Sequence, residues 1–148
     1  MEMIDIYTLK TEASFDSAHF LAGYDGKCRN LHGHRWRVVI KASSPELIKE
    51  GQCRGMVMDF GDLKDALKKE VDRLDHSLII EKGTLKEKTL EALREEDFKI
   101  FEFDFRPTAE NFARYFFDRL KEAGVPVSEA AVYETPNNCA IYTEGGAE

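Results

Sequence analysis

Two segments near the start of the chain alternate with the period of a β-strand, and they constrain the fold more than any other feature. The first covers about residues 4–20 and places Phe15 and His19 on one face. The second covers about residues 32–43 and begins as a clean alternation around Trp36. Glycines in the stretch between them favour a loop. We therefore expect the two segments to form neighbouring, paired strands.

Two amphipathic helices are expected further along the chain. The first begins near Asp59, a favourable N-cap, and ends at Asp75 and His76. The second begins at Thr108, directly after Pro107, and ends near a glycine and a proline. Both helices carry an apolar stripe at helical spacing. The stripes consist of Leu63, Leu67, Val71 and Leu74 in the first helix and Phe112, Phe116 and Leu120 in the second.

The C-terminal part predicts two short strands, "VSEAAVYE" and "CAIYTE", separated by the turn-forming "TPNN". The sum is one α+β domain over residues 1–148, with a four-stranded, mainly antiparallel sheet and two helices on one face. Such a sheet leaves its other face and its edges open, which oligomerisation would cover. Residues 77–107 are less regular. Residues 85–96 could form a helix, and "IFEFDFR" alternates strictly, which favours an extra strand or an exposed edge.

Composition limits the classes of function. The chain has 148 residues and a net charge of −7, which argues against a nucleic-acid partner. No apolar run is long enough to cross a membrane, and residues 1–10 lack the layout of a signal peptide, so we expect a cytoplasmic protein. The odd number of widely spaced cysteines favours free thiols. An anionic substrate would need local positive charge, for which Lys27, Arg29, Arg35 and Arg37 are the candidates.

The densest functional signal is the stretch "CRNLHGHRW". His32 and His34 are two residues apart, so on an extended backbone their imidazoles project to the same side. His19 ends the strand that we expect to pair with this one. Three neutral imidazoles around one ion are typical of a catalytic zinc site with an open position. The alternative is that His-Gly-His arises by chance from packed or surface histidines. Metal binding is favoured because three of the four histidines lie so close together.

Four further residues have both an ordinary and a functional interpretation. Cys28 is either a small buried apolar residue or a thiolate favoured by neighbouring positive charge. Asp75 and His76 fit a helix C-terminus, where a histidine complements the dipole, better than a proton-transfer pair. Glu134 is either a solvated carboxylate at a strand end or a partner for a guanidine-like edge such as that of a pterin.

Six motifs occur in the order seen in one family. They are "FDSAH", "CRNLHGH", "GMVMDFGDLK", "RLDHS", "PTAEN" and "YETPNNCAIY", and they span residues 19–142, nearly the whole chain. In this order they resemble the 6-pyruvoyl-tetrahydropterin synthase family. The resemblance implies a tunnelling fold (T-fold), in which subunits join their sheets into barrels, commonly as hexamers. No single motif would carry this resemblance alone.

The resemblance also implies a role for each matching residue. His19, His32 and His34 match the zinc ligands of the family, and Cys28 matches its catalytic cysteine. Asp75 and His76 match the pair that completes the proton-transfer triad of the family. In the family this triad is assembled across a subunit interface. Glu134 matches the residue that anchors the pterin, and Thr108 matches a secondary pterin contact.

The spacing of the cysteine indicates a branch of the family. Animal 6-pyruvoyl synthases resemble Cys-x5-His-Gly-His, whereas the bacterial 6-carboxytetrahydropterin synthases of queuosine biosynthesis resemble Cys-x3-His-Gly-His. Here three residues separate Cys28 from His32. The resemblance thus implies conversion of 7,8-dihydroneopterin triphosphate to 6-carboxytetrahydropterin, with release of acetaldehyde and triphosphate. A 6-pyruvoyl product and a non-catalytic zinc- or pterin-binding scaffold are the alternatives. Residues 77–106 depart from the family pattern, because this stretch is usually a short loop.

Overall fold

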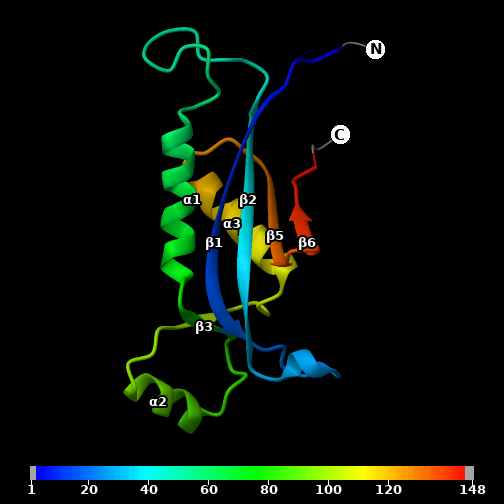
Figure 1. Cartoon of the computed structure of the whole chain (residues 1–148), viewed down its shortest axis with the longest axis vertical. Helices are drawn as coiled ribbons and strands as arrows, with labels where there is room; N and C mark the ends of the chain where they lie inside the picture. The colour runs from blue at the N-terminus through cyan, green and yellow to red at the C-terminus, as the bar shows by residue number, and fades with distance from the viewer. Residues whose placement is uncertain (1–2, 146–148) are drawn as a thin grey trace.

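The computed structural model describes residues 3–145, which form one six-stranded sheet with helices packed against it (Figure 1). The strand order across the sheet is β4-β3-β1-β2-β5-β6. The strands are β1 (Tyr7–His19), β2 (His32–Ser44), β3 (Ser77–Glu81), β4 (Ile100–Phe103), β5 (Val127–Thr135) and β6 (Asn138–Tyr142). The helices are α1 (Phe60–Leu74), α2 (Glu87–Glu95) and α3 (Ala109–Glu122), and a single 3-10 turn, η1 (Lys27–Arg29), precedes β2.

The two long N-terminal strands pair in antiparallel register, as the alternation predicts. The ladder runs from Tyr7 opposite Ser44 to His19 opposite His32. Phe15 lies opposite Trp36, and both side chains are buried on the helix-covered face. The same register that buries this aromatic pair therefore brings two histidines face to face at the end of the hairpin.

Helices α1 and α3 cover one face of the sheet, and the predicted apolar stripes of both are buried there. Each helix begins at the expected cap. The Asp59 carboxylate accepts from the Asp62 N–H at 3.1 Å, and the Thr108 hydroxyl accepts from the Asn111 N–H at 3.2 Å. Burying each large apolar side chain of this core contributes roughly 1.5–3 kcal/mol. The packing of α1 and α3 thus fixes the position of the segments that follow and precede them at the histidine end of the sheet.

The prediction of a four-stranded sheet with two helices is wrong, because residues 77–107 add two strands and a third helix. Strand β3 pairs in parallel with the end of β1 at Ser17 and Ala18, and β4 pairs in parallel with β3. The five-residue run of β3 is a short apolar segment without alternation, so its sequence carries no strand period. Helix α2 lies apart from the sheet at the lower end of Figure 1. It corresponds to the helix predicted over residues 85–96.

The alternation in "IFEFDFR" does form an edge strand. The rings of Phe101, Phe103 and Phe105 stack in sequence, with centroids 6.2 and 4.7 Å apart. They pack against the core beside α3. The added strands therefore extend the hydrophobic core instead of forming a loose loop. No described helix combines the length and the apolar composition needed to cross a bilayer.

Candidate active site

Three histidines meet at the end of the β1–β2 hairpin. His19 lies opposite His32 in the ladder, and His34 follows two residues later on the same face of β2. Their available ring nitrogens all lie within 4.8 Å of one another. Three nitrogens bound to one zinc ion at about 2.0–2.1 Å lie roughly 3.3 Å from each other. Small shifts of the imidazole rings would therefore bring this cluster to the geometry of a zinc site.

The hydrogen bonds of the cluster fix its tautomers. His19 Nδ1 lies 2.7 Å from the Pro107 carbonyl oxygen, and His32 Nδ1 lies 2.6 Å from that of Asn30. A carbonyl only accepts, so each Nδ1 carries the proton and each Nε2 presents a lone pair. The two Nε2 atoms are 3.0 Å apart. Two acceptors facing one another at this distance repel unless a cation lies between them.

His19 stays unprotonated at neutral pH. Its pKa is lowered from 6.5 to about 4, chiefly by burial and also by the neighbouring His32 and His34, while the hydrogen bond to the Pro107 carbonyl opposes this shift. Burial also lowers the pKa of His34. Neutral imidazoles with oriented Nδ1–H groups are the form in which histidine binds metals. The cluster is therefore suited to a metal ion.

Glu134 lies directly beside the histidine cluster. Its Oε1 atom lies 3.3 Å from His34 Nε2 and 3.7 Å from His19 Nε2. Among residues 3–145, His34 Nε2 is buried without a hydrogen-bond partner, so the contact with Glu134 is an electrostatic approach and not a well-aligned hydrogen bond. A buried nitrogen left without a partner fits a group that a metal ion would satisfy.

Glu134 also borders the cavity best placed to hold a ligand. This cavity of about 400 Å³ is lined by residues of β1, β2, the end of β5 and the turn that follows it, and both His34 and Glu134 lie in its wall. A molecule in it can therefore reach the carboxylate and the histidine cluster together. The lining residues are Ser14, His34, Arg35, Arg37, Tyr133, Glu134, Thr135 and Pro136.

Cys28 lies on η1 at the same end of the sheet. Its carbonyl accepts from the Leu21 N–H at 2.9 Å, which ties the turn to the chain just after β1. The thiol is free and half-buried. Lys27 and Arg29 flank it, and within the described part of the chain neither is engaged in an ion pair. These observations leave Cys28 available for chemistry beside positive charge.

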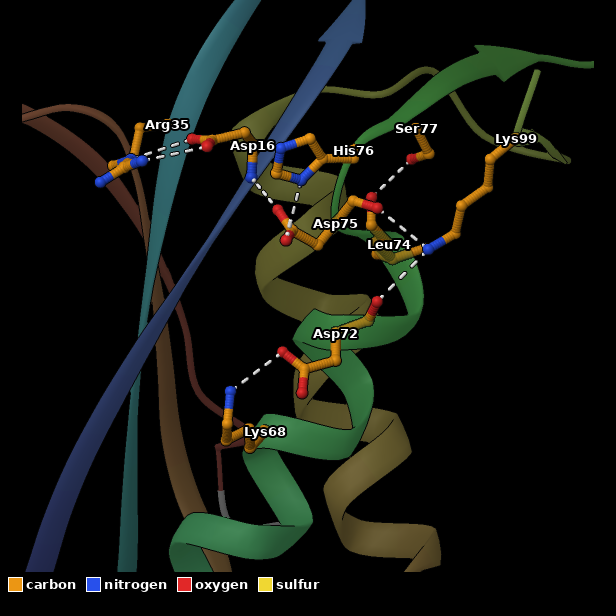
Figure 2. Close-up of polar contacts among 9 residues, drawn as sticks. All are labelled: Asp16, Arg35, Lys68, Asp72, Leu74, Asp75, His76, Ser77 and Lys99. Carbon is orange, nitrogen blue, oxygen red and sulfur yellow. Dashed lines mark hydrogen bonds and ion pairs between the residues drawn. The ribbon is translucent and has the colours of Figure 1, made fainter.

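The Asp75–His76 pair lies at the junction of α1 and β3 (Figure 2). Asp75 is the C-cap of α1, and His76 Nδ1 lies 3.0 Å from its carboxylate oxygen Oδ2. The His76 side chain is 78% exposed. It borders a second cavity, of about 380 Å³, that is also bordered by His34. The pair is therefore formed and points toward solvent near the histidine cluster.

Thr108 and two of the arginines expected to bind an anion are engaged in contacts within the chain. The Thr108 hydroxyl caps α3 by accepting from the Asn111 N–H, and it keeps its own proton to donate. Arg35 pairs with Asp16, and Arg37 pairs with Glu12, so both arginines are neutralised by carboxylates of β1. Lys27 and Arg29 lie on η1 and take no part in these ion pairs.

Sequence reasoning missed the groups that orient the histidines. The carbonyls of Pro107 and Asn30 have no side-chain signal, and Pro107 is 88 positions from the histidine that it holds. It also missed Asp16, whose main chain and carboxylate both contact functional groups. The only available hint was its place between Phe15 and Ser17 on the face opposite the core.

These features define a class: an α+β protein whose sheet carries a three-histidine site suited to a metal ion, with a cavity and ionisable side chains beside it. The sequence model of the family described as "6-pyruvoyl tetrahydropterin synthase" matches residues 8–145. The chain belongs to this family.

Relatives and solved structures agree with this placement. The chain is 39% identical over 142 residues to the 6-carboxy-5,6,7,8-tetrahydropterin synthase of Haemophilus influenzae, covering 94% of this chain and 100% of that protein. It is 34% identical over 139 residues to the Synechocystis protein of the same name, covering 93% of each. The structure of Caenorhabditis elegans 6-pyruvoyl tetrahydropterin synthase aligns with a TM-score of 0.67 and 25% identity, covering 98% of this chain and 100% of that one. An uncharacterised Wolinella succinogenes protein shares the fold, with a TM-score of 0.74 and 23% identity over 95% and 99% of the two chains.

Proposed function

We propose that this protein is a zinc-dependent 6-carboxy-5,6,7,8-tetrahydropterin synthase that acts on 7,8-dihydroneopterin triphosphate. The observation that carries the proposal is the cluster of His19, His32 and His34, with facing Nε2 lone pairs and Glu134 beside it. The name of the relatives at 34–39% identity supports the choice of reaction. The three-residue spacing between Cys28 and His32 supports the same branch.

The three histidines would hold Zn²⁺ through their Nε2 atoms. When bound, zinc would supply a Lewis acid that polarises the hydroxyl oxygens of the substrate side chain. Zinc is preferred over other ions because neutral imidazoles are among its usual ligands and three of them leave a position open. The carbonyls of Pro107 and Asn30 keep His19 and His32 oriented for this task.

Glu134 would hold the pterin. Its carboxylate can accept a forked pair of N–H bonds from the 2-amino edge of the ring, as carboxylates do from arginine. This requires Glu134 to turn from its present place near His34, 3.3 Å away, into the adjoining cavity. Thr108 would add a secondary contact through a hydroxyl that can donate to the ring while it still accepts from Asn111.

Cys28 would act as the base that removes a proton from the substrate side chain, with Lys27 and Arg29 supplying positive charge beside the thiolate. His76, oriented by Asp75, would carry protons on the other side of the substrate. Placing both groups in one site would involve two subunits, with the His76 of one protomer reaching toward the Cys28 of its neighbour. The exposure of the His76 side chain suits a group that acts beyond its own protomer.

The proposed assembly is a homo-hexamer with the active site at a subunit interface. Strand β1 pairs with β3 only at Ser17 and Ala18, so most of its outer edge is open, and β6 forms the opposite edge of the sheet. Open edges of this length favour pairing with another copy. Sheets joined in this way close into the barrel that the T-fold uses.

Mass spectrometry of the products tests the reaction. Zinc-loaded protein is incubated with 7,8-dihydroneopterin triphosphate, and 6-carboxytetrahydropterin with acetaldehyde is the expected result. A 6-pyruvoyl product would keep the site but overturn the branch assigned from the cysteine spacing. Unchanged substrate in the presence of bound metal would contradict enzymatic function and favour a scaffold.

A further inference from the structure

The main chain of Asp16, on β1, contacts both members of the Asp75–His76 pair, one through its N–H and the other through its carbonyl (Figure 2). Its N–H donates to Asp75 Oδ1 at 2.8 Å, and its carbonyl accepts from the His76 N–H at 2.7 Å. His76 has a φ of 58°, in the left-handed region that a non-glycine residue seldom adopts. Residues held in this region persist where surrounding contacts determine them, and they cluster at functional sites. The main chain of Asp16 supplies these contacts.

The side chain of Asp16 presents a competing partner for the same imidazole. Its carboxylate, that of Asp75 and the His76 ring offer atoms that all lie within 4.8 Å of one another. One ring nitrogen can donate to only one carboxylate at good geometry. If both carboxylates were free, Asp16 could draw the His76 proton away from Asp75. The pair would then lose a single defined arrangement.

Arg35, on β2, engages the Asp16 carboxylate with a forked contact. Its Nε donates to Oδ1 at 2.9 Å and its Nη2 donates to Oδ2 at 3.1 Å. Both oxygens of Asp16 are thus occupied, and the hydrogen bond from Arg35 is the main cause that lowers the pKa of Asp16. The Asp16 N–H is likewise the main cause that lowers the pKa of Asp75. Both carboxylates are therefore ionised at neutral pH, and of the two it is the Asp75 carboxylate that is paired with His76, while Asp16 is paired with Arg35.

Other charged groups around His76 leave this arrangement intact. Lys99, before β4, donates to the main-chain carbonyls of Asp72 and Asp75 and not to a carboxylate. His34 borders the same cavity as His76. In the part of the chain that the structure describes, Arg35 is the one basic side chain other than His76 paired with either aspartate.

We propose that Asp16 and Arg35 are positioning residues for the Asp75–His76 pair. The main chain of Asp16 sets the place of the pair, and Arg35 occupies the Asp16 carboxylate so that His76 Nδ1–H donates to Asp75 and Nε2 stays free to exchange protons. The catalytic meaning of this arrangement rests on the proposed function. The arrangement itself can be measured without it.

Nuclear magnetic resonance of ¹⁵N-histidine-labelled, zinc-loaded protein tests the proposal. The chain has four histidines, and three lie in the metal cluster, so His76 gives the one set of signals outside it. In the parent, the Nδ1–H tautomer is expected to dominate at neutral pH. In Arg35→Gln, the freed Asp16 carboxylate is expected to compete with Asp75 for the Nδ1 proton, so the Nδ1 and Nδ1–H signals of His76 should shift and broaden. Arg35→Lys should restore part of the parent spectrum, because an ammonium group keeps the charge but not the fork.

A double variant separates positioning from general support of the fold. Asp16→Asn/Arg35→Gln removes the competing charge and keeps the main-chain contacts of residue 16, so the parent His76 spectrum should return. If the Asp16–Arg35 pair only stabilised the sheet, the double variant would be as disturbed as the single one. Lys41→Gln is the matched control, because it breaks the Lys41–Glu129 ion pair on the same strand, away from His76. Its spectrum should equal that of the parent.

Kinetics give the second readout. Arg35→Gln should lower kcat about tenfold, a fraction of the roughly 10²–10⁴-fold that a positioned acid or base contributes, whereas a change in KM alone would reflect the place of Arg35 in the cavity wall and would overturn the positioning role. The double variant should recover most of that loss, and Lys41→Gln should lose nothing. An unaltered His76 spectrum in Arg35→Gln, or no recovery in the double variant, would overturn the proposal. If the parent turns over no pterin while the spectra change as expected, the proposed function fails and the positioning role stands.

Discussion

The histidine cluster and the Asp75–His76 pair lie at the same end of the sheet, yet the protein holds them in opposite ways. His19 is 1% exposed and is oriented by a main-chain carbonyl, in surroundings that disfavour a charged imidazole. His76 is 78% exposed and is oriented by a carboxylate that an adjacent strand holds in place. Burial with fixed tautomers suits a permanent metal ligand, whereas exposure beside a carboxylate suits a group that exchanges protons. Removing groups from each region should therefore have separable effects.

The largest effect is expected from the cluster. His34→Ala removes one of the three proposed metal ligands, so metal affinity should fall by more than the roughly 10–100-fold typical of losing an outer-shell partner. Turnover should be lost with it. Metal content after dialysis and product formation measure the two effects. His76→Ala is the control and should retain full metal content, and equal metal loss in both variants would remove the distinction between the regions.

Loss of Cys28 should abolish turnover almost as completely but spare the metal. In Cys28→Ala, kcat is expected to fall by about 10³-fold, because the base that removes the substrate proton is gone. Metal content should match that of the parent. Full activity in this variant would show that the base is another residue.

The exposed pair should have a smaller effect. His76→Ala is expected to lower kcat by about 10²-fold, at the lower end of the range for a general acid or base, with metal content unchanged. Asp75→Asn should lower kcat less, because the amide still accepts a hydrogen bond from the ring but no longer stabilises its charged form. Steady-state kinetics of the two variants measure this order, and a larger loss in Asp75→Asn would contradict the role of Asp75 as the orienting partner.

The buried cluster should also make the metal-free protein sensitive to acid. The pKa of His19 falls from 6.5 to about 4 on folding, so between these values the unfolded chain binds more protons than the folded one. Stability is then present above pH 6.5 and decreases as the pH falls toward 4, by about 3 kcal/mol for this group. Urea unfolding of metal-free protein across this range measures it. His19→Gln should give a flatter profile, and a parent profile that is already flat would contradict the burial argument.

The smallest effect is expected at Thr108, where capping and pterin contact can be told apart. Thr108→Ala should lower the free energy of unfolding by about 1 kcal/mol, because the Asn111 N–H loses its acceptor. Thr108→Ser should keep the cap. A rise in KM in Thr108→Ala that Thr108→Ser restores would support the pterin contact, and an unchanged KM would limit Thr108 to its capping role.

The sequence predicted those parts of the molecule whose signals are local. The alternation around Phe15 and Trp36 predicted the hairpin, and His-Gly-His placed two imidazoles on one side of it. Strand β3 was missed because its five residues have no period and its partner in β1 is about sixty positions away. The orienting groups were missed for a related reason. A carbonyl has no sequence signature, and the contact between Asp16 and Asp75 joins residues 59 positions apart.

The most direct test of the account is X-ray absorption spectroscopy of the purified protein at the zinc edge, with metal content measured on the same sample. We expect one zinc per protomer with three nitrogen ligands at about 2.0–2.1 Å and no sulfur ligand, and His34→Ala should lose this signature. A sulfur ligand at about 2.3 Å would make Cys28 part of the metal site and not the base. If protein prepared in the presence of zinc binds none, the central claim is contradicted. The close approach of the Nε2 atoms of His19 and His32 would then need an explanation that involves no cation.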